Sequence, residues 1–345
     1  MFSIGTKTPR DERLKLLERL QEIRRSRVIT CITSDRPNAT GVIAKDFMPR
    51  FYNHLKTFEP RDRIDIFLFT TGGDTLAAFG LSRMLREFGA HIGALIPEKC
   101  HSAGTLLVLG ANEIFMTRGA TLTPIDPSVT TPLNPRVELA PGLGQTSIPV
   151  SVENIAGFKD LVREEWHLGD HEAGAALQML AQAVNPLVLG QAFRSRQQID
   201  RLARALLGAH RTDNEKIGQI IEVLSRGLGS HDYLISRREA REVLGAQVLG
   251  DNAALEDAVW KLYAHYAEDM ELGKIFDANA ALQPHLLAGK AAPAKVLNRI
   301  VIIESQAGSD VWENELHVSP FTPAPGVRAA PCATTVLYSG WRHYD

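Results

Sequence analysis

Apolar and amphipathic segments alternate along the first third of the chain. Short apolar runs predict β-strands at residues 28–33, 64–70, 91–97 and 113–117. Apolar residues at helical spacing predict helices near 45–58, near 74–89 and from about 102. Strands that alternate with helices in this way indicate parallel strands joined by right-handed crossovers, so the pattern predicts an α/β fold.

Between residues 152 and 245 the pattern becomes mainly helical. Capping-box sequences predict helix starts at Thr212 with Glu215 and at Ser236 with Glu239. Further along, we expect a helix at 251–270, a strand at 296–305 and an irregular, proline-rich segment at 318–335.

The N-terminal segment also has a helical pattern, over residues 9–25. Leu16, Leu17, Leu20 and Ile23 recur at helical spacing among Arg, Lys and Glu, which indicates an amphipathic helix. We expect its apolar face to dock on the protein's own core, and this outcome is favoured over binding to a partner.

Composition narrows the classes of partner. The 345 residues are 44% apolar, enough for a large core, and 38 basic side chains nearly balance 40 acidic ones. This balance gives no attraction for nucleic acid or for an anionic membrane, so small substrates or proteins are the expected partners. Charged residues dominate the N-terminus, and nowhere does the chain run for 18 apolar residues without a charge. Neither a signal peptide nor a membrane span is therefore expected.

The three cysteines lack the spacing of a zinc site or a disulfide framework. Cys31, Cys100 and Cys332 are far apart in the sequence, and their number is odd. We interpret them as reduced thiols of a cytoplasmic protein.

Two segments contain the candidate chemistry. In the first, a predicted strand ends at Gly72-Gly73 and a helix begins, with Asp74 or Thr75 placed to cap it. In the second, a strand ends near Pro97 and Ser102 lies where the next helix starts, so its oxygen would lie at the positive end of the helix dipole.

Together these segments fit the requirements of acyl transfer. Such a reaction needs a nucleophile and backbone donors aimed at the developing oxyanion. Ser102 is the candidate nucleophile, and the N–H groups of Gly73 and Ala103 are the candidate donors. Either motif alone is common as plain structure, but the two in this order form a much stronger signal.

The two segments resemble the Clp-peptidase/crotonase superfamily, and most closely its serine dehydrogenase proteinase family, which is related to signal peptide peptidase A. The resemblance covers residues 26–130 well and 185–245 loosely. It rests on Thr71-Gly72-Gly73, Ser102-Ala103-Gly104-Thr105-Leu106, Ala111-Asn112-Glu113-Ile114 and Thr123-Pro124-Ile125-Asp126-Pro127.

The resemblance implies a repeated β-β-α core with a mainly helical second half. It implies an N-terminal helix at 1–25, a catalytic domain at 26–250 and a C-terminal extension at 251–345. It also implies a homo-oligomer that encloses the active sites.

A catalytic triad in the order Ser102, Asp126, His231 is likewise implied by the resemblance. The sequence departs from the family pattern at two positions, because Thr71 replaces a proline and Thr123 replaces a glycine. Neither change removes a catalytic group, but Thr123 restricts the loop that carries Asp126.

Other residues compete for these roles. His101 adjoins Ser102, but neighbouring side chains in such a turn point apart, so we interpret it as a cleft or packing residue. Lys159 is the alternative base, because relatives use a Ser-Lys dyad. His167 and His171 would suit a metal only on one continuous helix, and Gly169 weakens that helix. No metal or cofactor is expected.

The sequence therefore predicts a serine peptidase acting on a protein or peptide substrate. Two alternatives stay open: a crotonase-like acyl-binding enzyme without a nucleophilic serine, and a catalytically inactive assembly protein.

Overall fold

The computed structural model describes the chain except for residues 1–8, 61, 126–127, 139–143, 290–292 and 321–331. The chain forms two compact units. The first consists of Met1–Leu122 with Ser236–Asp345, and the second of Thr123–Ile235.

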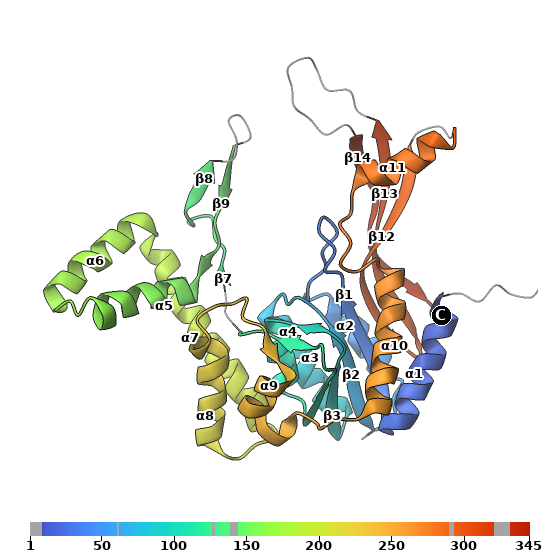
Figure 1. Cartoon of the computed structure of the whole chain (residues 1–345), viewed down its shortest axis with the longest axis horizontal. Helices are drawn as coiled ribbons and strands as arrows, with labels where there is room; N and C mark the ends of the chain where they lie inside the picture. Colours follow the sequence, from blue (N-terminus) through green and yellow to red (C-terminus); the bar gives the residue numbers. More distant parts are fainter. Residues whose placement is uncertain (1–8, 61, 126–127, 139–143, 290–292, 321–331) are drawn as a thin grey trace, which may run out of the picture. The chain divides into compact units, whose positions relative to one another are not determined.

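The first unit is a mixed α/β unit built around a central sheet (Figure 1). The strands of that sheet are β1 (Arg27–Thr33), β2 (Arg63–Phe69), β3 (His91–Ile96), β5 (Glu113–Met116), β12 (Ala294–Ser305), β13 (Gly308–Pro320) and β14 (Cys332–Tyr344). The helices are α1 (Pro9–Arg24), α2 (Phe47–Leu55), α3 (Thr75–Phe88), α4 (Ala103–Leu109), α9 (Arg237–Leu244), α10 (Ala253–Asp269) and α11 (Ala278–Leu287). A 3-10 turn, η3 (Gly245–Gln247), follows α9.

The sheet has a parallel half and an antiparallel half. Its order is β14-β13-β12-β1-β2-β3-β5. β1, β2, β3 and β5 pair in parallel, whereas β12 pairs antiparallel with both β1 and β13, and β14 pairs antiparallel with β13. A separate small sheet has the order β11 (Ile235–Ser236), β6 (Thr121–Leu122), β4 (Lys99–Cys100), and β4 and β6 pair in parallel.

Burial of both faces explains the apolar strands of the parallel half. β2 is buried at nearly every position, as expected for a parallel strand covered on both sides. Phe67 and Phe69 pack in one cluster with Leu17 and Leu20 of α1 and with Tyr266 of α10. Leu68 points the other way, toward the side where α2, α3 and α4 pack against one another.

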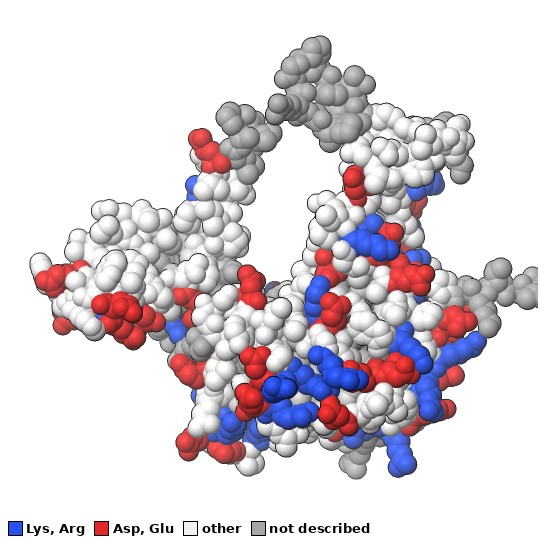
Figure 2. All heavy atoms as spheres, viewed as in Figure 1, with Lys and Arg blue, Asp and Glu red and all other residues white. Residues whose placement is uncertain are grey.

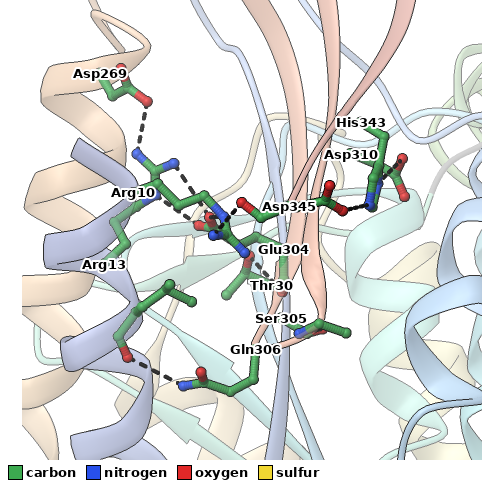
Figure 3. A network of polar contacts seen from close by, with 12 residues as sticks. Arg10, Arg13, Thr30, Asp269, Glu304, Ser305, Gln306, Asp310, His343 and Asp345 are labelled. Atoms are coloured by element: carbon green, nitrogen blue, oxygen red, sulfur yellow. Dashed lines mark hydrogen bonds and ion pairs between the residues drawn. The ribbon is translucent and has the colours of Figure 1, made fainter. Parts of the chain in front are cut away.

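A buried network of charges joins α1, α10 and β12 (Figure 3). Glu304 on β12 is fully buried, and its carboxylate lies 2.7 Å from Nε of Arg13, which is 4% exposed. Arg13 also reaches Asp269 of α10 at 2.8 Å, and the hydroxyl of Tyr266 donates to Glu304 at 2.6 Å. Burial raises the pKa of Tyr266, so its phenol stays protonated and remains a donor.

The second unit is mainly helical, with short strand pairs. Its helices are α5 (Val152–Asp160), α6 (Asp170–Ala183), α7 (Pro186–Gly208) and α8 (Asn214–Glu222), with π-helical turns η1 (Leu161–Glu165) and η2 (Val223–Gly227). The strands are β7 (Ser128–Val129), β8 (Arg136–Glu138), β9 (Gln145–Ser147) and β10 (Val150–Ser151), and β11 (Ile235–Ser236) lies at the junction with the first unit. β7 pairs with β10, and β8 pairs with β9.

Most elements predicted from the pattern are confirmed, including the α/β class and the helical second half. The capping box at Ser236 is present, but the one predicted at Thr212 is wrong, because Asp213 caps α8 instead. The prediction of an irregular segment at 318–335 is also wrong in part. β13 continues to Pro320 and β14 begins at Cys332, and residues 321–331 lie outside the described residues.

The apolar face of the N-terminal helix is occupied. Leu17 and Leu20 are fully buried in the core cluster with α10, which confirms docking on the protein's own core.

No single helix in the described ranges is long and apolar enough to cross a membrane. One pair, α6 with α7, reaches that length and apolarity when taken together, but it is bent by 102°.

The buried network predicts a large loss of stability for Glu304→Ala. The change leaves the Arg13 guanidinium buried with only part of its charge compensated, which should cost about 3–5 kcal/mol in the free energy of unfolding. Urea denaturation monitored by far-UV circular dichroism measures it. Glu22→Ala is the control on α1, because Glu22 pairs with Arg19 at the surface and should have little effect. Equal stabilities of the two variants would contradict a structural role for the network.

Candidate active site

A tight turn after β2 forms one half of the site. Gly72 and Gly73 have φ angles of 119° and 141°, a region that side chains rarely adopt. The turn is joined to Ile43 by two hydrogen bonds of 2.8 Å, from Ile43 N–H to Gly72 O and from Asp74 N–H to Ile43 O. A Cβ at Gly73 would lie 2.3 Å from the Ile43 carbonyl oxygen, so only glycine fits there.

Ser102 lies directly against this turn. Backbone hydrogen bonds from Thr70 N–H to Lys99 O at 2.9 Å and from His101 N–H to Thr70 O at 3.0 Å hold the two segments side by side. A Cβ built on Gly72 would stand 2.9 Å from Cβ of Ser102 and 3.4 Å from its Oγ. The structure thus brings together the two motifs that the sequence separates by about thirty positions.

The backbone of Ser102 is strained. It occupies the N-cap of α4 with φ 51° and ψ −112°, outside the regions favoured by residues with a side chain. Such a conformation costs about 1–3 kcal/mol and is typical of functional turns, including the nucleophile elbow of α/β-hydrolases.

Two backbone donors are available beside Ser102. Within the described ranges, neither the N–H of Gly73 nor that of Ala103 has a hydrogen-bond acceptor, although their neighbours Asp74 and Gly104 both have one. Ala103 opens α4, so its N–H has no partner inside the helix. Two neighbouring backbone N–H donors of this kind are the groups from which an oxyanion hole is built.

Small residues after Ser102 permit the close approach. A Cβ at Gly104 would meet Cγ2 of Thr70 at 2.5 Å. The hydroxyl of Thr70 accepts a hydrogen bond from Gly72 N–H at 3.1 Å and lies 2.9 Å from the Thr33 hydroxyl. Thr70 and Ile43 therefore position the turn, and the sequence analysis missed both, because neither belongs to a motif and the contacts are long-range.

Groups next to Ser102 are poorly suited to act as nucleophile or base. Burial raises the pKa of the Cys100 thiol, so it stays protonated. Burial alone would lower the pKa of Lys99, but its hydrogen bond to Asp35, 2.5 Å away, and the charges of Asp35 and Glu98 raise it above the ordinary value. His101 has Nε2 2.9 Å from the Thr121 hydroxyl, as expected of a packing residue.

The other members of the predicted triad belong to the second unit. Asp126 lies outside the described residues. His231 occupies the loop after η2, and in the part of the chain that the structure describes its buried Nδ1 has no hydrogen-bond partner. Ile125, directly before Asp126, donates its N–H to the carbonyl of Leu224 in η2 at 2.8 Å.

The alternative sites have ordinary surface geometry. Lys159 in α5 is 78% exposed and lies 3.9 Å from Asp160. His171 is on α6, whereas His167 precedes the start of that helix, so the two do not share one helical face. A search of the described ranges finds no group of three His, Cys, Asp or Glu side chains that could hold a metal ion.

The sheet and the glycine turn beside Ser102 belong to one α/β unit. Residues 3–138 match the family model of the ClpP-like SDH-type serine proteinases.

Two curated proteins of Methanocaldococcus jannaschii are similar in sequence. The chain is 26% identical over 240 residues to uncharacterized protein MJ0137, covering 67% of this chain and 71% of that protein. It is 36% identical over 66 residues to uncharacterized protein MJ1495, covering 19% of this chain and 23% of that protein.

Two solved structures are similar to part of this chain. ClpP1 from Listeria monocytogenes is 15% identical with a TM-score of 0.35, covering 68% of this chain and 98% of that chain. A mutant of the 1510-N membrane-bound stomatin-specific protease is 13% identical with a TM-score of 0.34, covering 62% and 77%.

The strained backbone at position 102 predicts that Ser102→Gly is more stable than Ser102→Ala. Glycine relieves the strain, whereas alanine keeps a Cβ and with it the strain, so the difference should be about 1 kcal/mol after glycine's own entropy cost. Urea unfolding midpoints compare the two variants.

Ser82, inside helix α3, provides the matched control. There Ser82→Gly should be less stable than Ser82→Ala, because glycine weakens a helix interior. The same order at both positions would show that Ser102 stores no strain.

Proposed function

We propose that this chain is a serine peptidase that hydrolyses peptide bonds through an acyl-enzyme on Ser102. The observation that carries the proposal is the strained Ser102 packed against the glycine turn, with two backbone N–H groups beside it that have no acceptor among the described residues. The family match of residues 3–138 supports proteinase chemistry at this turn. The substrate is a protein or peptide.

The reaction follows from these groups. Oγ of Ser102 attacks the scissile carbonyl carbon while a base takes its proton, and the oxyanion accepts hydrogen bonds from the N–H groups of Gly73 and Ala103. Collapse of this intermediate breaks the C–N bond, and the leaving amine takes the proton back from the base. Water then hydrolyses the ester by the same steps and restores the serine.

His231 is the proposed base, with Asp126 holding its tautomer. Among the described residues the buried Nδ1 of His231 has no hydrogen-bond partner, which supports a role for an acid partner at that atom, as in the Ser-His-Asp triad. The hydrogen bond between Ile125 and Leu224 supports the pairing, because it links the segment just before Asp126 to the one that leads to His231.

Lys159 is less suited to the role of base. A lysine base must be neutral at working pH, which requires burial or a nearby positive charge. Lys159 is 78% exposed and its ammonium lies 3.9 Å from the Asp160 carboxylate, so it lacks this burial.

The protein is further proposed to act in the cytoplasm as a homo-oligomer. The described cysteines are free thiols, as in a reducing compartment. β14 forms one end of the sheet and exposes Val336 and Leu337, and such an edge strand can pair with a second copy.

A fluorophosphonate probe tests the nucleophile and the base. The wild type should be labelled at Ser102, and Ser102→Ala should not be labelled at all. His231→Ala should lose labelling rate by roughly 10³-fold or more, as other triad deletions do, whereas Lys159→Ala should change it little. Labelling should also increase as the pH rises, because a histidine base must be neutral to accept the proton.

His171→Ala is the matched control, since it removes an exposed histidine of the same unit. Loss of labelling in Lys159→Ala, with His231→Ala unaffected and both proteins folded, would refute the triad. A wild type that is not labelled would instead favour one of the two alternatives, a crotonase-like acyl-binding enzyme or a catalytically inactive assembly protein.

Light scattering tests the oligomer. At micromolar concentration the mass should be a multiple of the 37.9 kDa monomer. Val336→Lys should lower that mass, because a lysine on an edge strand opposes strand pairing. A monomer mass for the wild type would count against self-association.

A further inference from the structure

An uncharged segment links two helices of the second unit. Residues 173–193 contain no Asp, Glu, Lys or Arg and cover most of α6 and the first turns of α7. The two helices reach the apolarity and length of a membrane span only together, and they are bent by 102° at the break between them. Asn185 caps α7 there, accepting a hydrogen bond from Leu187 N–H, and Pro186 follows at the first helical position.

The apolar side chains of α6 are exposed on more than one side. In the described structure α6 has no buried residue, and Leu177 and Met179 are 59% and 70% exposed. These two residues are two positions apart, so they lie about 200° apart around the helix axis. Figure 2 shows a largely uncharged surface over α6 with acidic residues near its end.

The start of α7 differs from α6, because one face of α7 is buried. Val188 and Ala192 are buried in a cluster with Val129 and Val152. The other face exposes Leu187 at 71% and Phe193 at 62%. The exposed apolar surface therefore continues from α6 across the bend onto α7.

The positions of the exposed apolar side chains on α6 and α7 indicate what covers them. Leu177 and Met179 lie on opposite sides of α6, so whatever covers both must surround the helix, as acyl chains do. A helix that exposes apolar side chains on opposite sides and is not buried in its own protein has this requirement. Trp166 before α6 is more than half exposed, and tryptophan favours the membrane–water interface.

The helix lengths determine how deeply the segment inserts. α6 has 14 residues and is about 21 Å long at about 1.5 Å per residue, shorter than a hydrocarbon core of about 30 Å. The 102° bend prevents α7 from completing a straight span. Gln178 and Gln182 favour a shallow position, because their amides need hydrogen-bond partners that the headgroup region supplies.

We propose that α6 and the first turns of α7 insert into one face of a lipid bilayer, in the boundary between headgroups and acyl chains. The segment is a shallow anchor that holds the protein at a membrane surface without spanning it. Residues 173–193 are uncharged and acidic residues precede them, so binding should not depend on anionic lipid.

Co-sedimentation of the full chain with phosphatidylcholine vesicles tests the anchor. The wild type should sediment with the vesicles, and the double variant Leu177→Glu, Met179→Glu should lose at least tenfold in partition coefficient. The control is Leu286→Glu, Leu287→Glu on α11, which adds the same charges at residues that are 44% and 88% exposed. The control should bind as the wild type does.

Quenching of tryptophan fluorescence by brominated phosphatidylcholine locates the contact. Trp166→Phe should remove most of the lipid-dependent quenching. Trp260→Phe should retain it, because Trp260 is similarly exposed at 50% but lies on α10 of the other unit.

Three results would overturn the proposal. The first is a wild type that binds no phosphatidylcholine vesicles, or only vesicles containing phosphatidylglycerol. The second is a double Glu variant that binds as well as the wild type. The third is a double Glu variant with a lower mass in light scattering without lipid, since the surface would then be an interface between copies. Circular dichroism and fluorophosphonate labelling of the variants establish that a loss of binding is not a loss of folding.

Discussion

The close approach of two backbone segments, residues 70–73 and 99–102, is the constraint on which the candidate site depends. Gly72, Gly73 and Gly104 each occupy a place where a Cβ would collide with a neighbouring segment. Because these contacts are made by backbone and small side chains, they fix the oxygen of Ser102 and two donor N–H groups without mobile side chains. A site assembled in this way needs little rearrangement before a reaction, which is the property expected of a preorganised oxyanion hole.

The proposed chemistry is divided between the two units. The proposed nucleophile and backbone donors are built into the first unit, where long-range hydrogen bonds to Ile43 and Thr70 hold them. The proposed base and its acid belong to the inserted second unit. Such a division lets the geometry of the nucleophile be fixed independently of the groups that move protons.

Local sequence signals were sufficient for the strands, the helices and the two motifs, because apolar periodicity and glycine placement are properties of neighbouring residues. Contacts between distant segments were not accessible in this way. Nothing near Ile43 or Thr70 marks them as supports of the turn, and a single sequence does not contain the pairing of β12 with β1. Asp213 shows a different limit, since two adjacent residues both suit an N-cap and the sequence alone does not choose between them.

The pairing of β1 with β12 has a consequence for synthesis on the ribosome. β1 and β2 emerge early, but the strand that covers the other edge of β1 begins only at Ala294, after the whole second unit has been made. Arg13 likewise cannot form its ion pair with Glu304 until that residue has been synthesised. An apolar sheet edge therefore stays open through most of translation, and such edges attract both chaperones and misfolded neighbours. The insertion thus makes the nascent chain, rather than the finished protein, the form most exposed to aggregation.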